Sequence, residues 1–375
     1  MRKARLMPLL ALTGMACAIA VSACGSTAGT AAEASGSKSQ SVISNRSWNE
    51  GGSLTVPTPK PNSGKGVKIA FTGFGQNNPY SQWIFKAIAK EAKKFGASAT
   101  FVGPPSFEEQ GQYEVLSDIA QTKSYNAVIM LPINGAQIVP AAERLIKSGI
   151  KVATVSEIVG PKAEATHVQV PGITTEVFAP VVVNAEVMGR GVIQACTGIK
   201  ECEVDILWGN TSLSFDHAKL APFKATIAGH SNIKVVCESN ANYTQQEGRT
   251  EAANCLQAHP HVHVVASQAD ESARGAEGAI EAAGKTVGLG KSDVVIIGSY
   301  ASRYGVKKVR EGKWLQTWYA RPESMGFTAV DLILRSLEGK KVPDFIRQEQ
   351  LDGLGSVLTR KTLEENPHIT GQWEG

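Results

Sequence analysis

The sequence predicts an α/β protein made of two lobes, each built around a doubly wound parallel sheet. Its 375 residues exceed the length of one ordinary domain, and 42% of them are hydrophobic, which is enough for a sizeable core. Apolar segments of strand length alternate with segments of helical spacing along most of the chain. The strands are almost continuously apolar, which is typical of parallel sheets covered on both faces, and about ten strands are too many for one modest sheet.

The first series of elements runs from residue 67 to residue 157. Strands are expected at the apolar runs, and helices where apolar residues recur at helical spacing before a glycine such as Gly96. The expected strands are 67–74, 97–103, 126–133 and 151–157, and the expected helices are 79–96, 107–123 and 136–149.

A second series begins near residue 176 and follows the same alternation. The expected helices are 176–196, 215–229, 244–259, 271–285 and 324–339, and the expected strands are 202–210, 233–240, 262–270, 293–300 and 314–322. In doubly wound sheets, ligands bind beyond the carboxyl ends of the strands, so the residues that follow these strands are the candidates for a binding site.

Residues 1–23 are predicted to be a lipoprotein signal peptide. A positively charged start precedes an apolar stretch of signal-peptide length, and Pro8 and Gly14 argue against a spanning helix. The segment 21–24, Val-Ser-Ala-Cys, resembles the bacterial lipobox, in which cleavage precedes a cysteine that then carries lipid. The resemblance implies that Cys24 is lipidated, so acyl chains would hold the protein at a membrane without spanning it.

Residues 24–66 are predicted to be a flexible linker. The segment is rich in Ser, Gly, Ala, Thr and Pro and has no apolar periodicity. Such a stretch cannot bury enough apolar surface to offset the entropy cost of ordering it.

Charge and motifs exclude several classes of protein. The net charge is only +4, whereas a nucleic-acid-binding protein needs a strongly basic face. The segment 284–292, GKTVGLGKS, has the wrong spacing and context for a phosphate-binding loop, and no G-x-S-x-G elbow occurs. The alternate histidines of His259-Pro-His-Val-His263 lack Cys or carboxylate partners, so a turn before a strand is favoured over a metal site. We therefore expect no catalytic residues, no metal and no cofactor.

Four cysteines remain after the signal peptide and Cys24 are set aside. An even number in an exported protein favours two disulfides, for which three pairings are possible. The pairing Cys196–Cys202 would join a helix end to the next strand, and Cys237–Cys255 would join a strand to its following helix. These are the predicted pairs, and reduced thiols in the core are the alternative.

The stretch after the first strand, Gln76-Asn77-Asn78-Pro79-Tyr80, resembles the opening of the ribose-binding class of periplasmic sugar-binding proteins. These are type I substrate-binding proteins of ABC importers. Further similar segments follow in order between residues 67 and 360; they are 126–157, 256–285, 294–313 and 337–343. The segment 101–121 also looks like the subgroup that binds rhamnose or the furanosyl autoinducer AI-2.

The resemblance implies a discontinuous first lobe and a three-strand hinge. It places the crossings near 167–170, near Arg321 and near 344–348. Lobe 1 would then comprise 67–169 plus 321–346, and lobe 2 would comprise 170–320 plus 347–375. Ligand would bind between the lobes and close them, because contacts to both sides exist only in the closed state.

The resemblance also suggests nine ligand-binding residues, each at a position that the family uses. Asn78 would bond sugar hydroxyls, and Tyr80 and Tyr243 would stack on the sugar ring. The complete set is Asn78, Tyr80, Ser156, Glu157, Asp216, Lys219, Tyr243, Asp270 and Tyr300. Structural roles are the alternatives: Asn78 and Asp270 as helix caps, the tyrosines as lobe packing, and Glu157 and Lys219 as solvated rim charges.

The sequence departs from the family pattern where charged groups usually bind pentose hydroxyls. Ser156, Ala269, Tyr300 and Ala320 replace acidic, basic or amide side chains of the family. A site with fewer charged and amide side chains favours stacking and apolar contact with the ligand, so ribose is not the expected ligand. A deoxysugar or a sugar with an apolar substituent fits better.

The resemblance implies an exported, lipid-anchored solute receptor, at the outer face of the cell membrane or in the periplasm. Its expected partners are a sugar, deoxysugar or polyol and an ABC permease, and it is expected to be a monomer that is not an enzyme. The alternative is a sensory receptor for a sugar or an AI-2-like signal that feeds chemotaxis or a kinase. An exported enzyme is a third possibility, which the lack of a nucleophile–base set disfavours.

Overall fold

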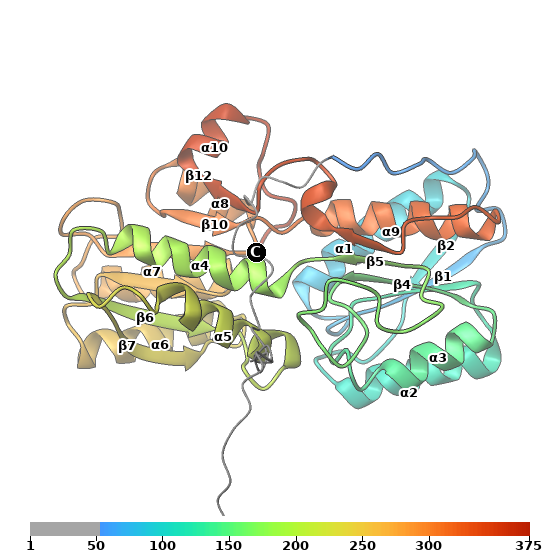
Figure 1. Cartoon of the computed structure of the whole chain (residues 1–375), viewed down its shortest axis with the longest axis horizontal. Helices are drawn as coiled ribbons and strands as arrows, with labels where there is room; N and C mark the ends of the chain where they lie inside the picture. Colours follow the sequence, from blue (N-terminus) through green and yellow to red (C-terminus); the bar gives the residue numbers. More distant parts are fainter. Residues whose placement is uncertain (1–52) are drawn as a thin grey trace, which may run out of the picture. The chain divides into compact units, whose positions relative to one another are not determined.

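Two six-stranded sheets organise the residues that the computed structural model describes, which are 53–375 (Figure 1). The predicted signal peptide and the predicted lipidation site Cys24 lie outside the described residues. The predicted class is confirmed, because each sheet is the centre of a lobe with helices on both faces. Among residues 53–375, no helix is both long enough and apolar enough to cross a membrane.

Lobe 1 is built on a sheet in which every pair of neighbouring strands is parallel. The strand order is β11-β5-β4-β3-β1-β2. The strands are β1 (Lys68–Thr72), β2 (Ser98–Phe101), β3 (Ala127–Met130), β4 (Lys151–Ser156), β5 (Thr175–Phe178) and β11 (Phe345–Arg347). The helices are α1 (Pro79–Lys94), α2 (Glu109–Thr122), α3 (Val139–Lys147) and α9 (Pro322–Leu337).

The apolar strands of lobe 1 bury both faces, as their near-continuous hydrophobicity predicted. Ile69 and Phe71 pack in a core with residues of α1 and α9, whereas Ala70 between them packs with residues of α2 and α3. This alternation follows from the two-residue period of a strand. Helix α1 begins where predicted because Pro79 opens it and the Asn78 side chain accepts a hydrogen bond from the Ser81 amide at 2.9 Å.

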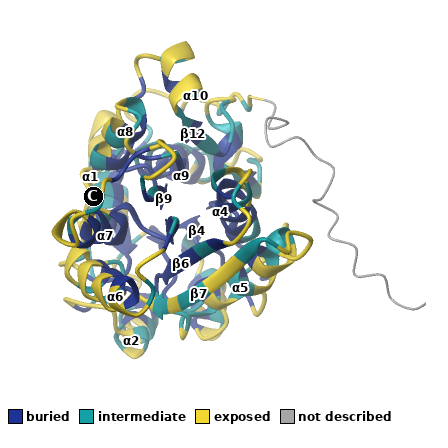
Figure 2. Cartoon of the chain, turned by 90° about the vertical axis from the view of Figure 1, so that its left-hand side faces the viewer, coloured by how far each residue is buried: buried dark blue, intermediate teal, exposed yellow. Residues whose placement is uncertain are grey.

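Lobe 2 has the strand order β12-β10-β9-β8-β6-β7, parallel except for the β10–β12 pair. The strands are β6 (Cys202–Trp208), β7 (Ile233–Asn240), β8 (Val264–Ser267), β9 (Val295–Ser299), β10 (Gln316–Trp318) and β12 (Val357–Thr359). The helices are α4 (Val181–Ala195), α5 (Ser214–Ile227), α6 (Gln245–Ala258), α7 (Asp270–Ala282), α8 (Arg303–Arg310) and α10 (Arg360–Glu365), with the short 3-10 helix η1 (Gln348–Gln350) near the third crossing. The inner strands are buried, while the edge strand β7 is largely exposed (Figure 2).

The chain crosses between the lobes three times, and the first crossing differs from the expectation. Strand β5 pairs with β4 in lobe 1, so the chain leaves lobe 1 after Phe178 and not near 167–170. The segment 176–178 is a strand and not the start of a helix: it pairs with β4 and β11, and helix α4 begins only after Pro180. The other crossings lie between β10 and α9 and between β11 and β12.

The predicted flexible linker, residues 24–66, includes a segment at its carboxyl end that is packed against the protein. Residues 53–66 lie against lobe 1, where Leu54 and Val56 pack on the core. The Leu54 amide donates to the Gln350 carbonyl at 2.7 Å, and the Gly64 amide donates to the Phe95 carbonyl at 2.9 Å. These backbone hydrogen bonds are the means by which a segment poor in apolar residues is held.

Both predicted disulfide pairs are present in lobe 2. Cys196 at the end of α4 bonds to Cys202 at the start of β6, and Cys237 of β7 bonds to Cys255 of α6. The alternative of reduced thiols does not describe this structure.

Removing a disulfide should destabilise lobe 2 more when the disulfide closes a longer loop. The sequence separations are 18 residues for Cys237–Cys255 and 6 for Cys196–Cys202. Chain entropy then predicts losses of about 3 and about 2 kcal/mol for the paired alanine substitutions. Urea denaturation of the two double variants measures both values, and a larger loss for the short loop would contradict the loop-length argument.

Candidate functional site

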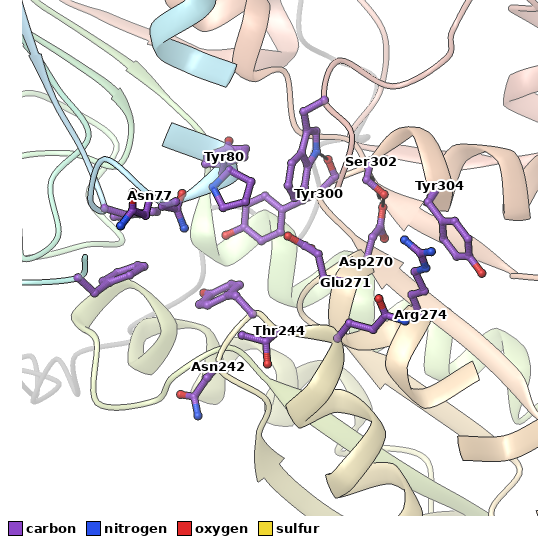
Figure 3. A pocket seen from close by; sticks show the side chains of 18 of the residues that line it. Asn77, Tyr80, Asn242, Thr244, Asp270, Glu271, Arg274, Tyr300, Ser302 and Tyr304 are labelled. Carbon is purple, nitrogen blue, oxygen red and sulfur yellow. Dashed lines mark hydrogen bonds between the residues drawn. The ribbon is translucent and has the colours of Figure 1, made fainter. Parts of the chain in front are cut away.

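A cavity of about 510 Å³ lies between the two lobes. Lobe 1 contributes residues after β1 and between β2 and α2, and lobe 2 contributes residues after β7, β8 and β9. Figure 3 shows Asn77 and Tyr80 facing Asn242 and Thr244 across it. The lining residues are Phe74, Asn77, Asn78, Pro79, Tyr80, Pro105, Ser106, Phe107, Asn242, Tyr243, Thr244, Gln245, Asp270, Glu271, Arg274, Tyr300, Ser302, Tyr304, Trp373 and Gly375.

Five of the nine residues proposed from the sequence line this cavity. They are Asn78, Tyr80, Tyr243, Asp270 and Tyr300. The other four, Ser156, Glu157, Asp216 and Lys219, do not line it and form a buried polar cluster behind the tyrosines. All nine lie at or beyond the carboxyl ends of strands, where ligands bind in parallel α/β sheets.

Three tyrosines form the wall between the cavity and the polar cluster. Tyr300 of lobe 2 is the central ring; its centroid lies 5.6 Å from that of Tyr80 and 6.2 Å from that of Tyr243, in edge-to-face arrangements. Edge-to-face pairs hold aromatic rings at defined angles. Because Tyr80 belongs to lobe 1 and Tyr300 to lobe 2, this wall also joins the lobes.

The backbone at this wall adopts conformations that L-amino acids rarely take. Ser156, Tyr243 and Tyr300 have φ values of 64°, 59° and 80°, and Asn242 and Ala301 beside two of them have 46° and 47°. A left-handed backbone at a tyrosine costs free energy, and such residues gather at functional sites. Each of these residues ends or follows a strand, β4, β7 or β9, and three of them, Asn242, Tyr243 and Tyr300, line the cavity.

The cluster behind the wall contains a buried ion pair. The Lys219 ammonium lies 2.9 Å from an Asp216 carboxylate oxygen, with the side chains 1% and 0% exposed. Tyr243 donates its hydroxyl hydrogen to Asp216 at 2.5 Å, and Lys219 donates to the Tyr300 hydroxyl at 3.3 Å and to Gln268 at 3.4 Å. The interpretation of Lys219 as a rim charge is therefore wrong, because the ion pair holds two wall tyrosines in place.

Glu157 is also buried, at 6% exposure, and not a solvated rim charge. Its neighbour Ser156 lies 3.4 Å from the Tyr80 hydroxyl, which places this turn directly under the wall. Burial raises the pKa of the Glu157 carboxyl to about 8, against the opposing effect of the Lys219 ammonium. The group is therefore mostly protonated at pH 7 and can donate a hydrogen bond.

The raised pKa of Glu157 predicts that stability falls as pH rises. The carboxyl titrates near 4.5 when unfolded and near 8 when folded, so between these values the folded state holds an extra proton. Raising the pH from 5 to 8 should therefore destabilise the wild type, and Glu157→Gln should remove the part of that loss that this carboxyl causes. Urea denaturation at both pH values measures the change. The exposed Glu143→Gln is the control, and an equal pH dependence in all three proteins would contradict the prediction.

Asp270 lines the cavity, but its carboxylate is bonded within lobe 2. It accepts hydrogen bonds from the Ser302 amide at 2.7 Å, the Ser302 hydroxyl at 2.9 Å and the Thr317 hydroxyl at 3.0 Å. Burial nevertheless raises the pKa of this carboxyl to about 7. Asp270 therefore positions the turn that carries Tyr300. Its carboxylate does not cap α7, and its hydrogen bonds go to Ser302 and Thr317 of lobe 2.

Sequence reasoning missed several residues of the cavity. Asn77 and Glu271 are direct neighbours of the proposed residues Asn78 and Asp270. Their positions just after predicted strands could have identified them as candidates. One oxygen of the Glu271 carboxylate is buried without a hydrogen-bond partner among the described residues. Arg274 lies one helical turn beyond Asp270 and contacts the Tyr304 ring, 4.5 Å from its centroid. Trp373 comes from the segment after α10, which no sequence pattern connected with the site.

The sequence matches the family model described as periplasmic binding protein domain over residues 69–341. Two curated relatives are similar over most of their length. The D-allose-binding periplasmic protein of Escherichia coli (strain K12) is 25% identical over 286 residues, which cover 75% of this chain and 88% of that protein. The ribose import binding protein RbsB of Bacillus subtilis (strain 168) is 26% identical over 266 residues, covering 71% and 80%.

Solved structures share the two-lobed fold. An ABC transporter solute binding protein from Mycobacterium smegmatis with bound glycerol has a TM-score of 0.67 at 20% identity, covering 82% of this chain and 99% of that one. A Mycobacterium smegmatis protein in complex with β-D-fucofuranose has a TM-score of 0.69 at 19% identity, covering 80% and 94%. At these identities the likeness concerns the fold, which is that of type I periplasmic binding proteins.

Proposed function

Since the chain belongs to the periplasmic binding protein domain family, we propose that it is an exported lipoprotein that delivers a sugar to an ABC importer. The cavity between the lobes is the observation that carries this proposal, because both lobes contribute side chains to its wall. A ligand bound there favours the closed arrangement, since its contacts to both lobes exist only when they are together. A permease that recognises this arrangement would accept the loaded protein.

The chemistry of the cavity supports a carbohydrate that presents an apolar face. The aromatic rings of Tyr80, Tyr243, Tyr300 and Trp373 offer flat surfaces for the C–H groups of a sugar ring. Asn77, Asn78 and Glu271 offer a few hydrogen-bonding groups for hydroxyls. The charged pair Asp216–Lys219 stays behind the wall. This balance favours a deoxysugar or a sugar with an apolar substituent over a fully hydroxylated pentose.

The curated relatives support the carbohydrate class, since one is named for D-allose and others for ribose. The lipid anchor rests on the lipobox-like segment 21–24. The family's role outside the cytoplasm agrees with such an anchor.

Thermal-shift measurements test the proposal on the full-length mature protein. D-allose, D-ribose, L-rhamnose and D-fucose form a panel with two fully hydroxylated sugars and two deoxysugars. A ligand that binds only the folded state raises the melting temperature, by an amount that grows with its concentration. We expect a concentration-dependent rise with at least one sugar and a larger rise with a deoxysugar. No shift with any of the four at millimolar concentration would overturn the carbohydrate proposal.

A further inference from the structure

The segment after α10, residues 366–375, connects the two lobes outside the three crossings. It starts in lobe 2, where Ile369 packs in the core. Three residues later the Gln372 side chain reaches helix α9 of lobe 1. Gln372 accepts a hydrogen bond from the Ser324 amide at 3.0 Å and donates one to the Ser324 hydroxyl at 2.8 Å. The Ser324 amide lies in the first turn of α9, where amides have no partner within the helix.

Trp373 touches both lobes and the cavity. Its side chain is 2% exposed. The ring lies edge-to-face with Tyr80 of lobe 1, 5.3 Å between centroids, and the indole N–H donates to the Tyr300 carbonyl of lobe 2 at 2.8 Å. Trp373 is thus packed against the ring of Tyr80 and hydrogen-bonded to the backbone of Tyr300 while it lines the cavity.

The path of this segment is set by its contacts with lobe 2. The Arg303 amide donates to the Trp373 carbonyl at 2.8 Å, and the Arg303 guanidinium pairs with Glu374. Gly371 has a φ of 82°, and a Cβ there would lie 2.8 Å from the Ala301 carbonyl oxygen. Only glycine combines this backbone conformation with so close an approach to the Tyr300–Ser302 turn.

We propose that residues 371–374 form a strap that holds the two lobes together over the cavity, with Trp373 as the positioning residue that couples the strap to Tyr80 and Tyr300. The presence of a ligand in the cavity rests on the proposed function. The strap rests only on the contacts described above. Separation of the lobes breaks the Gln372–Ser324 hydrogen bonds and the Trp373–Tyr80 contact together. The strap therefore biases the protein toward the closed arrangement, and ligand exchange requires its release.

Ligand-free measurements on the full-length mature protein test the strap. Gln372→Ala removes the contact with lobe 1, and Lys361→Ala is the matched control, because its exposed ion pair with Glu365 lies within α10 and outside residues 371–374. We expect a larger radius of gyration by small-angle X-ray scattering for Gln372→Ala. Hydrogen exchange of the Ser324 amide should become about tenfold faster in this variant, a change of the size that loss of one or two hydrogen bonds produces. Lys361→Ala should match the wild type in both measurements.

A second pair of variants tests the role of Trp373. Trp373→Ala should enlarge the radius of gyration as Gln372→Ala does, while Trp373→Phe, which keeps a ring against Tyr80, should stay near the wild type. Wild-type values for Gln372→Ala and Trp373→Ala in both measurements would overturn the strap. If D-allose and the other sugars of the panel fail to bind while the variants open, the proposed function fails and the strap stands. If a sugar binds and no variant opens, the strap fails and the proposed function stands.

Discussion

Lys219→Ala should lower the free energy of unfolding by about 3–5 kcal/mol, the usual loss when one member of a buried ion pair is removed. The substitution leaves the Asp216 carboxylate in the interior without its cation, and it removes the donor to the Tyr300 hydroxyl. Urea denaturation measures the loss. Lys224→Ala on the same helix is the matched control, because its pair with Glu238 is exposed and should contribute less than about 1 kcal/mol.

The double variant Asp216→Asn with Lys219→Met separates charge from packing. It removes both charges and keeps most of the volume, so it should recover much of the stability lost in Lys219→Ala. Equal losses for Lys219→Ala and Lys224→Ala would show that the Asp216–Lys219 pair does not support the wall.

Arg321→Ala should have an effect of similar size, about 3–5 kcal/mol, because it also leaves buried partners unpaired. The Arg321 side chain is fully buried at the second crossing. Its guanidinium bonds to Asp352 at 2.7 Å, to the Tyr319 carbonyl at 2.9 Å and to the Leu354 and Gly355 carbonyls at 3.0 Å. One side chain thus joins the second crossing to the segment of the third.

Urea denaturation measures the loss in Arg321→Ala as well. Arg360→Ala, which breaks an exposed pair with Glu364, is the matched control and should change the stability by less than about 1 kcal/mol. A loss in Arg321→Ala no larger than that of the control would contradict the assignment of Arg321 as the link between two crossings.

Strands were predictable from the sequence where an apolar run stood between clear helix signals. Lys68–Thr72 and Ala127–Met130 are of this kind. Strand β5 was missed because its four residues stand close before helix α4, so periodicity could not separate a short buried strand from a helix start. Without β5, the first crossing is predicted too early in the chain. Which lobe a segment belongs to depends on the strands it pairs with, and no local sequence pattern contains that pairing.

The candidate site was predictable where it depends on strand ends. Tyr80, Tyr243 and Tyr300 reach the same cavity because parallel strands end at one edge of each sheet. The sequence does not show that Asp216 and Lys219 form a buried ion pair behind the tyrosines, since burial is a property of the assembled lobes. Trp373 lies in a segment without periodicity, and only tertiary packing brings it to the cavity.

Calorimetric titration of Tyr80→Ala and Tyr243→Ala tests most directly whether a sugar binds between the lobes at the tyrosine wall. The titrant is the sugar of the panel that raises the melting temperature most. Each variant should bind it about 1–3 kcal/mol more weakly than the wild type, the usual cost of truncating a buried aromatic anchor. Tyr125→Ala, remote from the cavity in lobe 1, is the control and should bind normally. Wild-type affinity in both wall variants, with unchanged circular dichroism, would contradict a ligand site in this cavity.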